Sequence, residues 1–99
     1  MPTPVVNQQG YVALIEAVVR DKMRSFGPLA VRKLHGIVGL RLDDGGTILE
    51  LGRDPVEVLH EVVVCFEKLA GKASVVFAKK AIQPVLAKYP GLTLPVELR

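Results

Sequence analysis

Two histidines, one cysteine and two serines are the side chains of this sequence best suited to chemistry, and their spacing organises none of them into a site. Glu57 and Glu61 flank His60 at helical spacing, but a metal ion there would need a third ligand from elsewhere in the chain. His35 has no histidine, cysteine or carboxylate three or four positions away. We therefore expect a solvated polar stripe around His60 and no metal site.

Nucleophilic catalysis has three candidates, Ser25, Ser74 and Cys65, and none lies in a nucleophile-elbow motif or beside a local base. Cys65 is the only cysteine and lies inside the apolar run 62–66, which favours a buried, unreactive thiol. The glycines at 36 and 39 precede an expected strand rather than a helix, so they do not form a phosphate-binding loop. The sequence thus predicts no catalytic residue and no cofactor.

The segment 43–46, Asp-Asp-Gly-Gly, resembles part of a calcium-binding loop but lacks the further spaced oxygens and the terminal glutamate. It is fully explained as a hairpin turn, since Asp and Gly tolerate the positive φ that such turns need. Strands are expected on either side, over residues 37–42 and 47–51. A two-stranded ribbon of this kind is marginal alone and must pack on helices.

The expected register pairs Leu42 with Thr47. The aliphatic positions of the ribbon, which would then share one face, are Val38, Leu40, Leu49 and Leu51. A slip of one residue would mix the two faces. The free edges of the ribbon could also pair with the same ribbon in another subunit.

Helices are expected on both sides of this ribbon. Residues 1–7 are interpreted as an extended arm, and Asn7 as the N-cap of an amphipathic helix over 8–26. A glycine and a proline at 27–28 end it and begin a short helix to about residue 35. The pair Asp54-Pro55 starts a third helix that runs to about residue 70, and its largely apolar circumference predicts the most buried helix.

A fourth helix is expected over residues 73–88, with a kink or an early end at Pro84. Residues 90–99 alternate apolar and polar side chains and are interpreted as an extended tail. We therefore expect a single α+β domain, mostly α, in the order α-α-β-β-α-α. Two helical hairpins then surround a two-stranded antiparallel ribbon.

The two helical halves align when the sequence is shifted by 44 residues. Gly27 and Val31 then fall on Gly71 and Val75, so each half is a long helix, a glycine break and a second helix. An ancient duplication and chance similarity both fit this pattern. In either case the first hairpin carries a basic outer side and the second is expected to be nearly all buried, so the first hairpin and the ribbon are the better place for a partner.

Composition favours association. The chain is 49% hydrophobic with five aromatics and no Trp, and its mean hydropathy is positive. A chain of 99 residues with so many aliphatic side chains is expected to leave an apolar patch exposed, as interaction surfaces do. It has no apolar run near the ~20 residues that span a bilayer and no leader pattern. We expect a cytoplasmic protein without membrane contact.

The leading hypothesis is a small non-enzymatic regulatory or protein-interaction module that acts as a homodimer, or that binds another protein. Its candidate interface combines the ribbon, an apolar residue on the polar stripe of the third helix, and the tail. The residues are Val38, Leu40, Leu49, Leu51, Val64, Leu92 and Leu94.

The alternative is a small DNA-binding regulator. Residues 22–35 join two helices through a tight glycine turn, as a helix-turn-helix does. Its candidate nucleic-acid contacts are Lys22, Arg24, Arg32 and Lys33. The start of the second helix is Leu-Ala-Val, however, where a recognition helix normally offers polar side chains. The net charge of +3, with interspersed signs, is also too small for a strong basic stripe.

Overall fold

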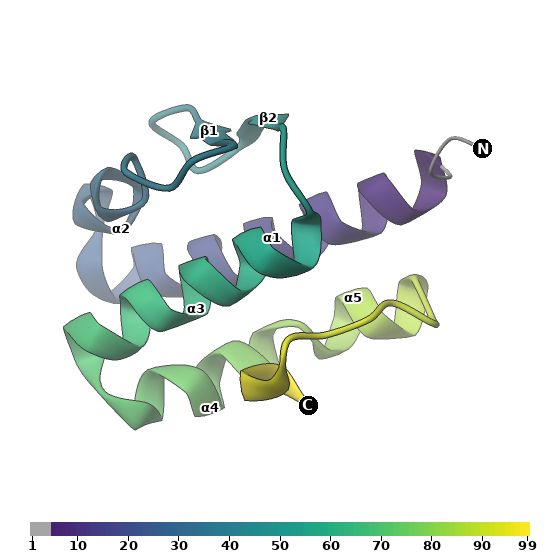
Figure 1. The fold of residues 1–99 in the computed structure, drawn as a ribbon. Helices are drawn as coiled ribbons and strands as arrows, with labels where there is room; N and C mark the ends of the chain where they lie inside the picture. The colour runs from purple at the N-terminus through teal and green to yellow at the C-terminus, as the bar shows by residue number, and fades with distance from the viewer. Residues whose placement is uncertain (1–4) are drawn as a thin grey trace.

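The computed structural model describes residues 5–99 as a mostly helical fold with one two-stranded antiparallel sheet. The elements are α1 (Val5–Phe26), α2 (Pro28–Lys33), β1 (Leu40–Leu42), β2 (Ile48–Leu51), α3 (Pro55–Ala70), α4 (Lys72–Ala81), α5 (Gln83–Lys88) and a final 3-10 turn η1 (Val96–Leu98). The expected order α-α-β-β-α-α is confirmed. Figure 1 shows α1 beside α3, with α2 and the hairpin on one side of this pair and α4 and α5 on the other.

The core is one cluster of aliphatic side chains supplied mainly by α1 and α3. Among its fully buried members are Leu14 and Ile15 of α1, and Leu59 and Phe66 of α3. Helix α1 contacts α2, α3, α4, α5 and β2, so α1 is the helix on which most other elements pack. The amphipathic stripe of α1 is long enough to reach every other helix, whereas α3 is partly open along one side.

Helix α3 begins and ends as its sequence predicts. The Asp54 carboxylate accepts a hydrogen bond from the Val56 amide at 3.1 Å, and Pro55 occupies the first turn. Gly71 ends α3 at φ 83°, as Gly27 lies between α1 and α2 at φ 59°. Both glycine breaks are confirmed, because a left-handed residue can reverse the chain direction without Cβ strain.

Two helix boundaries differ from expectation, and the expected break of the fourth helix near Pro84 is confirmed. Residues 5–7 belong to α1, so Asn7 is inside the helix and not its cap; of the expected arm, residues 1–4 lie outside the described residues. Helix α2 ends at Lys33 rather than near 35. The fourth helix divides at Ile82 into α4 and α5, with Pro84 in the first turn of α5. Proline lacks the amide that would continue the helical hydrogen bonds, which accounts for the break.

The hairpin forms at the expected turn, but the predicted register of its strands is wrong. The Asp43 carboxylate accepts hydrogen bonds from the amides of Gly45 and Thr47, both at 2.9 Å. These bonds place residues 43–47 in the turn, one residue more than expected, so Leu42 pairs with Ile48, and a bulge then sets Leu40 opposite Leu51. Local side-chain chemistry in the turn therefore overrides the alternation of apolar residues.

The first strand is also shorter than expected, beginning at Leu40 instead of residue 37. Consecutive turns occupy the chain from Leu34 to Leu40. Gly39 lies at φ 83°, and a Cβ there would come within 2.7 Å of the Cβ of Arg53. The chain crosses close to Arg53 at this point and pairs as a strand only after it.

The tail, residues 90–99, packs against the rest of the fold without forming a strand. Leu92 and Leu94 are half-buried against the core and Leu98 is buried. Val96 breaks the expected alternation, with 70% of its surface exposed, because the chain turns into η1 there. Tyr11 fixes the start of the tail by accepting a hydrogen bond from the Thr93 amide on its hydroxyl, at 2.8 Å.

Candidate functional site

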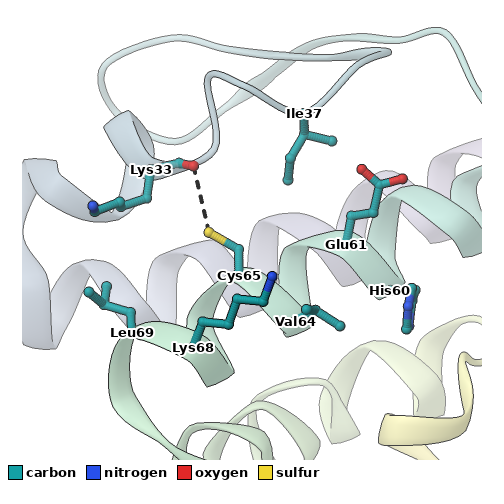
Figure 2. Close-up of a pocket in the computed structure, with 8 residues that line it drawn as sticks. All are labelled: Lys33, Ile37, His60, Glu61, Val64, Cys65, Lys68 and Leu69. Carbon is teal, nitrogen blue, oxygen red and sulfur yellow. Dashed lines mark hydrogen bonds between the residues drawn. The ribbon is translucent and has the colours of Figure 1, made fainter.

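The outer side of α3 carries an open groove, shown in Figure 2, with a volume of about 480 Å³. Its floor is apolar and comes from α3, while one wall comes from α2 and the loop that follows it. The lining residues are Lys33, Ile37, His60, Glu61, Val64, Cys65, Lys68 and Leu69. We call this the α3 groove. It forms because α3 keeps apolar side chains on a stripe that no other helix of the described chain covers.

Cys65 lies in the middle of the α3 groove, half-buried and unpaired with any other cysteine. Its Sγ donates a weak hydrogen bond to the carbonyl oxygen of Lys33 at 3.6 Å. Burial raises the pKa of the thiol, and the nearby charges of Lys33 and Lys68 only partly oppose this. A backbone carbonyl cannot act as a base, so the environment favours the protonated thiol and not a nucleophilic thiolate.

The rim of the α3 groove carries both signs of charge. Lys33 and Lys68 lie towards one end, and Glu61 lies towards the other. Glu61 forms a short ion pair with Arg53, which also lies 3.6 Å from Glu57. The hydrogen bond to Glu61 raises the pKa of Arg53. Arg53 thus orders the acidic end of the stripe without covering it, since the Glu57 side chain stays 65% exposed.

His60 and the two carboxylates that flank it contact different partners. His60 Nδ1 lies 2.8 Å from a carboxylate oxygen of Glu97 in η1, while Glu57 and Glu61 face Arg53. Burial would raise the pKa of Glu97, but hydrogen bonds from His60 and from its own backbone outweigh burial and lower it. Among residues 5–99 no group of three or more His, Cys, Asp and Glu side chains is arranged to hold a metal ion.

A second groove of about 500 Å³ lies between α1 and the α4–α5 pair. Its walls carry cations from both sides, and its floor is apolar with one aromatic ring. The lining residues are Ala17, Arg20, Asp21, Arg24, Phe77, Lys80, Ala81, Pro84 and Val85. We call this the α1–α4 groove. It shares no lining residue with the α3 groove.

Lys22 lies directly behind the α1–α4 groove and is only 4% exposed. Its ammonium donates to the carbonyl oxygen of Ser74 at 2.8 Å, lies 3.0 Å from the Asp21 carboxylate and is 5.9 Å from the centre of the Phe77 ring. This set of contacts joins α1 to the first turn of α4. Lys22 lies on the apolar side of α1, and the structure buries its charge as well as its aliphatic stem.

The interface residues expected from sequence do not lie together. Leu40 is buried, and Leu51, Leu92 and Leu94 pack against the protein's own core. Leu49 of β2 is 55% exposed, and Val38, in the turns before β1, is 70% exposed. Val64 lies in the α3 groove, and Val38 directly follows Ile37, which forms the wall of that groove.

The four basic residues of the helix-turn-helix alternative lie in different parts of the fold. Lys22 is buried, and Arg24 lines the α1–α4 groove. Arg32 lines a small hollow with Asp44, and Lys33 lines the α3 groove. The short α2 has only six residues. The structure therefore does not bring these cations onto one face.

Sequence reasoning missed Phe77 and Lys80 as a pair. Phe77 is 55% exposed although it is one of the few aromatic residues in the chain. The signal in the sequence was the position of Phe77 in the fourth helix, because it falls between the inward-facing residues 75 and 78 and does not continue an apolar stripe. Its proximity to cations of α1, however, depends on how the two helices pack.

Comparison with known proteins finds no protein family, no curated protein and no solved structure that matches this chain. None of the helices between residues 5 and 99 is both long and apolar enough to cross a membrane.

Proposed function

We propose that this protein is a non-enzymatic interaction module that acts as a homodimer, with the exposed stripe of α3 as the face between the two copies. The observation that carries the proposal is the order of charges along this stripe. Glu57, Glu61, Val64 and Lys68 follow one another at spacings of four, three and four, so they lie along one side of the helix. The sign of the charge reverses at the apolar centre.

Such a stripe is complementary to itself. In an antiparallel pair of α3 helices with the two-fold axis between residues 64 and 65, Glu61 of each copy faces Lys68 of the other. Val64 then faces Cys65, so that apolar surface meets apolar surface at the axis. An isologous interface needs this kind of self-complementary patch.

The α3 groove supplies apolar area for such a contact. Leu69 is 37% exposed at one end, and Ile37 and Val38 line and extend the wall. Burying this surface would gain roughly 25 cal/mol per Å² before the costs of association. The mixed rim adds orientation, because opposite charges fix the register and like charges penalise a parallel arrangement.

Sedimentation velocity at micromolar protein tests the proposal, and we expect a species of twice 10.7 kDa. Lys68→Glu and Glu61→Lys each place like charges opposite one another, so each variant alone is expected to be monomeric. An equimolar mixture of the two restores opposite charges at both contacts and is expected to form a heterodimer.

Lys88→Glu is the matched control, because Lys88 is the basic residue in the last turn of α5 as Lys68 is in that of α3. It should leave the dimer intact. Thermal melting of every variant checks that the fold is retained, since Glu61→Lys also removes a partner of Arg53. A monomeric wild-type protein, or a mixture that stays monomeric, would contradict the proposal.

A further inference from the structure

The α1–α4 groove differs from the dimer face in carrying an excess of one sign of charge. Arg24 and Lys80 face it from opposite sides, and no carboxylate within the described residues lies within ion-pair distance of either. Arg20 lies 3.4 Å from Glu16, and the side chain of Arg20 is 61% exposed. Asp21, the one acidic residue of the lining, is held by the ammonium of Lys22. The open part of the groove is therefore cationic.

The floor of this groove is suited to apolar side chains. Phe77 is half-exposed, and Pro84 and Val85 of α5 continue the apolar surface. The break at Ile82 between α4 and α5 is what presents Pro84 and Val85 along the same groove. A cavity of about 500 Å³ is within the usual size range of binding pockets. It can take a few side chains of a partner rather than a whole domain.

We propose that the α1–α4 groove binds an acidic amphipathic helix of another protein, with an apolar side chain against Phe77 and carboxylates against Arg24 and Lys80. A groove between two helices is a common binding site for a third helix, which contacts the groove through side chains at spacings of three and four residues. Arginine pairs with carboxylates through two parallel hydrogen bonds, which favours an acidic partner.

Two other occupants fit less well. Residues 1–4, which lie outside the described residues, contain no acidic side chain, so they cannot supply the complementary charge. Single-stranded nucleic acid would use the cations and one aromatic ring, but such proteins stack several successive bases on aromatic platforms. The groove offers only Phe77, and the ammonium of Lys22 lies 5.9 Å from the centre of its ring.

Fluorescence anisotropy tests the proposal with a labelled synthetic peptide of about 16 residues, enough for four helical turns. Its leucines follow one face and its glutamates flank that face. We expect saturable binding that weakens as salt rises. The variant Arg24→Glu/Lys80→Glu is expected to bind about tenfold or more weakly. The control Arg32→Glu/Lys88→Glu changes the net charge equally outside the groove and should bind as the wild type does.

Matched apolar variants test the floor. Phe77→Ala is expected to weaken peptide binding by about tenfold, whereas Val76→Ala, which removes an equally exposed side chain outside the groove, should not. Equal weakening by both double variants would reduce the effect to net charge and overturn the proposal, as would no binding by the wild type. Tighter binding of oligo-dT at the same residues would assign the groove to nucleic acid instead.

This proposal is independent of the dimer. A Lys68→Glu monomer should still bind the peptide, and the Arg24→Glu/Lys80→Glu variant should still sediment as a dimer. A change of oligomeric state on reversing Arg24 and Lys80 would mean that a second copy occupies the groove, which also contradicts an external partner.

Discussion

The two grooves share one fold but differ in how their charges are arranged. The α3 groove has acidic residues at one end and basic residues at the other, around an apolar centre, so a second copy can satisfy it. The α1–α4 groove has cations on both walls and its single carboxylate already neutralised from behind. A second copy turned by a two-fold axis would bring cations against cations there. Charge order, more than charge number, therefore separates a surface for self-association from a surface for an unlike partner.

The two grooves also differ in how firmly the helices that line them are packed on the core. The α3 groove rests on a helix whose inner face is anchored by fully buried residues such as Leu59 and Phe66. The α1–α4 groove depends on α4 and α5, and α5 has no buried residue. Its main polar anchor is Lys22. This difference means that the second groove can be disrupted by changes that leave the first one formed.

Removing Lys22 is expected to have the largest effect. Lys22→Ala leaves the Asp21 carboxylate without its partner and opens space between α1 and α4. We expect a loss of about 2–4 kcal/mol in the free energy of unfolding, measured by urea denaturation. Arg24 is exposed and lies two residues further along α1. Arg24→Ala should therefore change the free energy of unfolding by less than about 0.5 kcal/mol. Similar values for the two variants would show that the buried ammonium does not anchor α4.

Lys22 also shows how much of the structure can be predicted from the sequence. The inward stem of Lys22 was predictable from its place on the apolar stripe of a helix. The fate of its amine was not, because the carbonyl of Ser74 is 52 residues away and reaches it only when α1 packs on α4. The same limit explains the α1–α4 groove, whose cations come from separate helices.

Local features were predicted best. The start of α3 follows from Asp54 and Pro55 alone, and the hairpin turn follows from the residues at 43–46. The predicted register was wrong because the Asp43 side chain holds Thr47 in a turn one residue longer than expected, and because Gly39 lets the chain pass close to Arg53. Val64 was singled out from sequence as an apolar residue on a polar stripe, and the structure places it in an open groove.

A charge at the centre of the α3 stripe is expected to have the next largest effect, on the dimer rather than on the fold. Val64→Asp places an uncompensated carboxylate against the two-fold axis, so we expect the dimer dissociation constant to rise about 100-fold. Val76→Asp is the matched control, since Val76 is an exposed valine of α4 outside the α3 groove. Sedimentation equilibrium measures both, and an unchanged constant for Val64→Asp would place the dimer face elsewhere.

The thiol of Cys65 gives a smaller effect that follows dimer formation. Its pKa is raised by burial, so alkylation by iodoacetamide should increase with pH at higher values than for an ordinary cysteine. At protein concentrations that favour the dimer, we expect alkylation at a given pH to be slower by about tenfold, because the second copy covers the groove. Lys68→Glu should abolish this concentration dependence, whereas the Arg24→Glu/Lys80→Glu variant should keep it.

The contact between Glu97 and His60 is expected to give the smallest effect, because it lies near the surface, although His60 also lines the α3 groove. The folded-state pKa of Glu97 is lowered, so its contribution to stability is present above its ordinary pKa of 4.5 and is lost as pH falls through the lower, folded value. Glu97→Gln should therefore cost less than about 1 kcal/mol at pH 6, the usual range for exposed ion pairs. Urea denaturation at decreasing pH should show the wild type and the variant converging, whereas a constant gap down to low pH would show that the carboxylate charge is not what fixes η1 on α3.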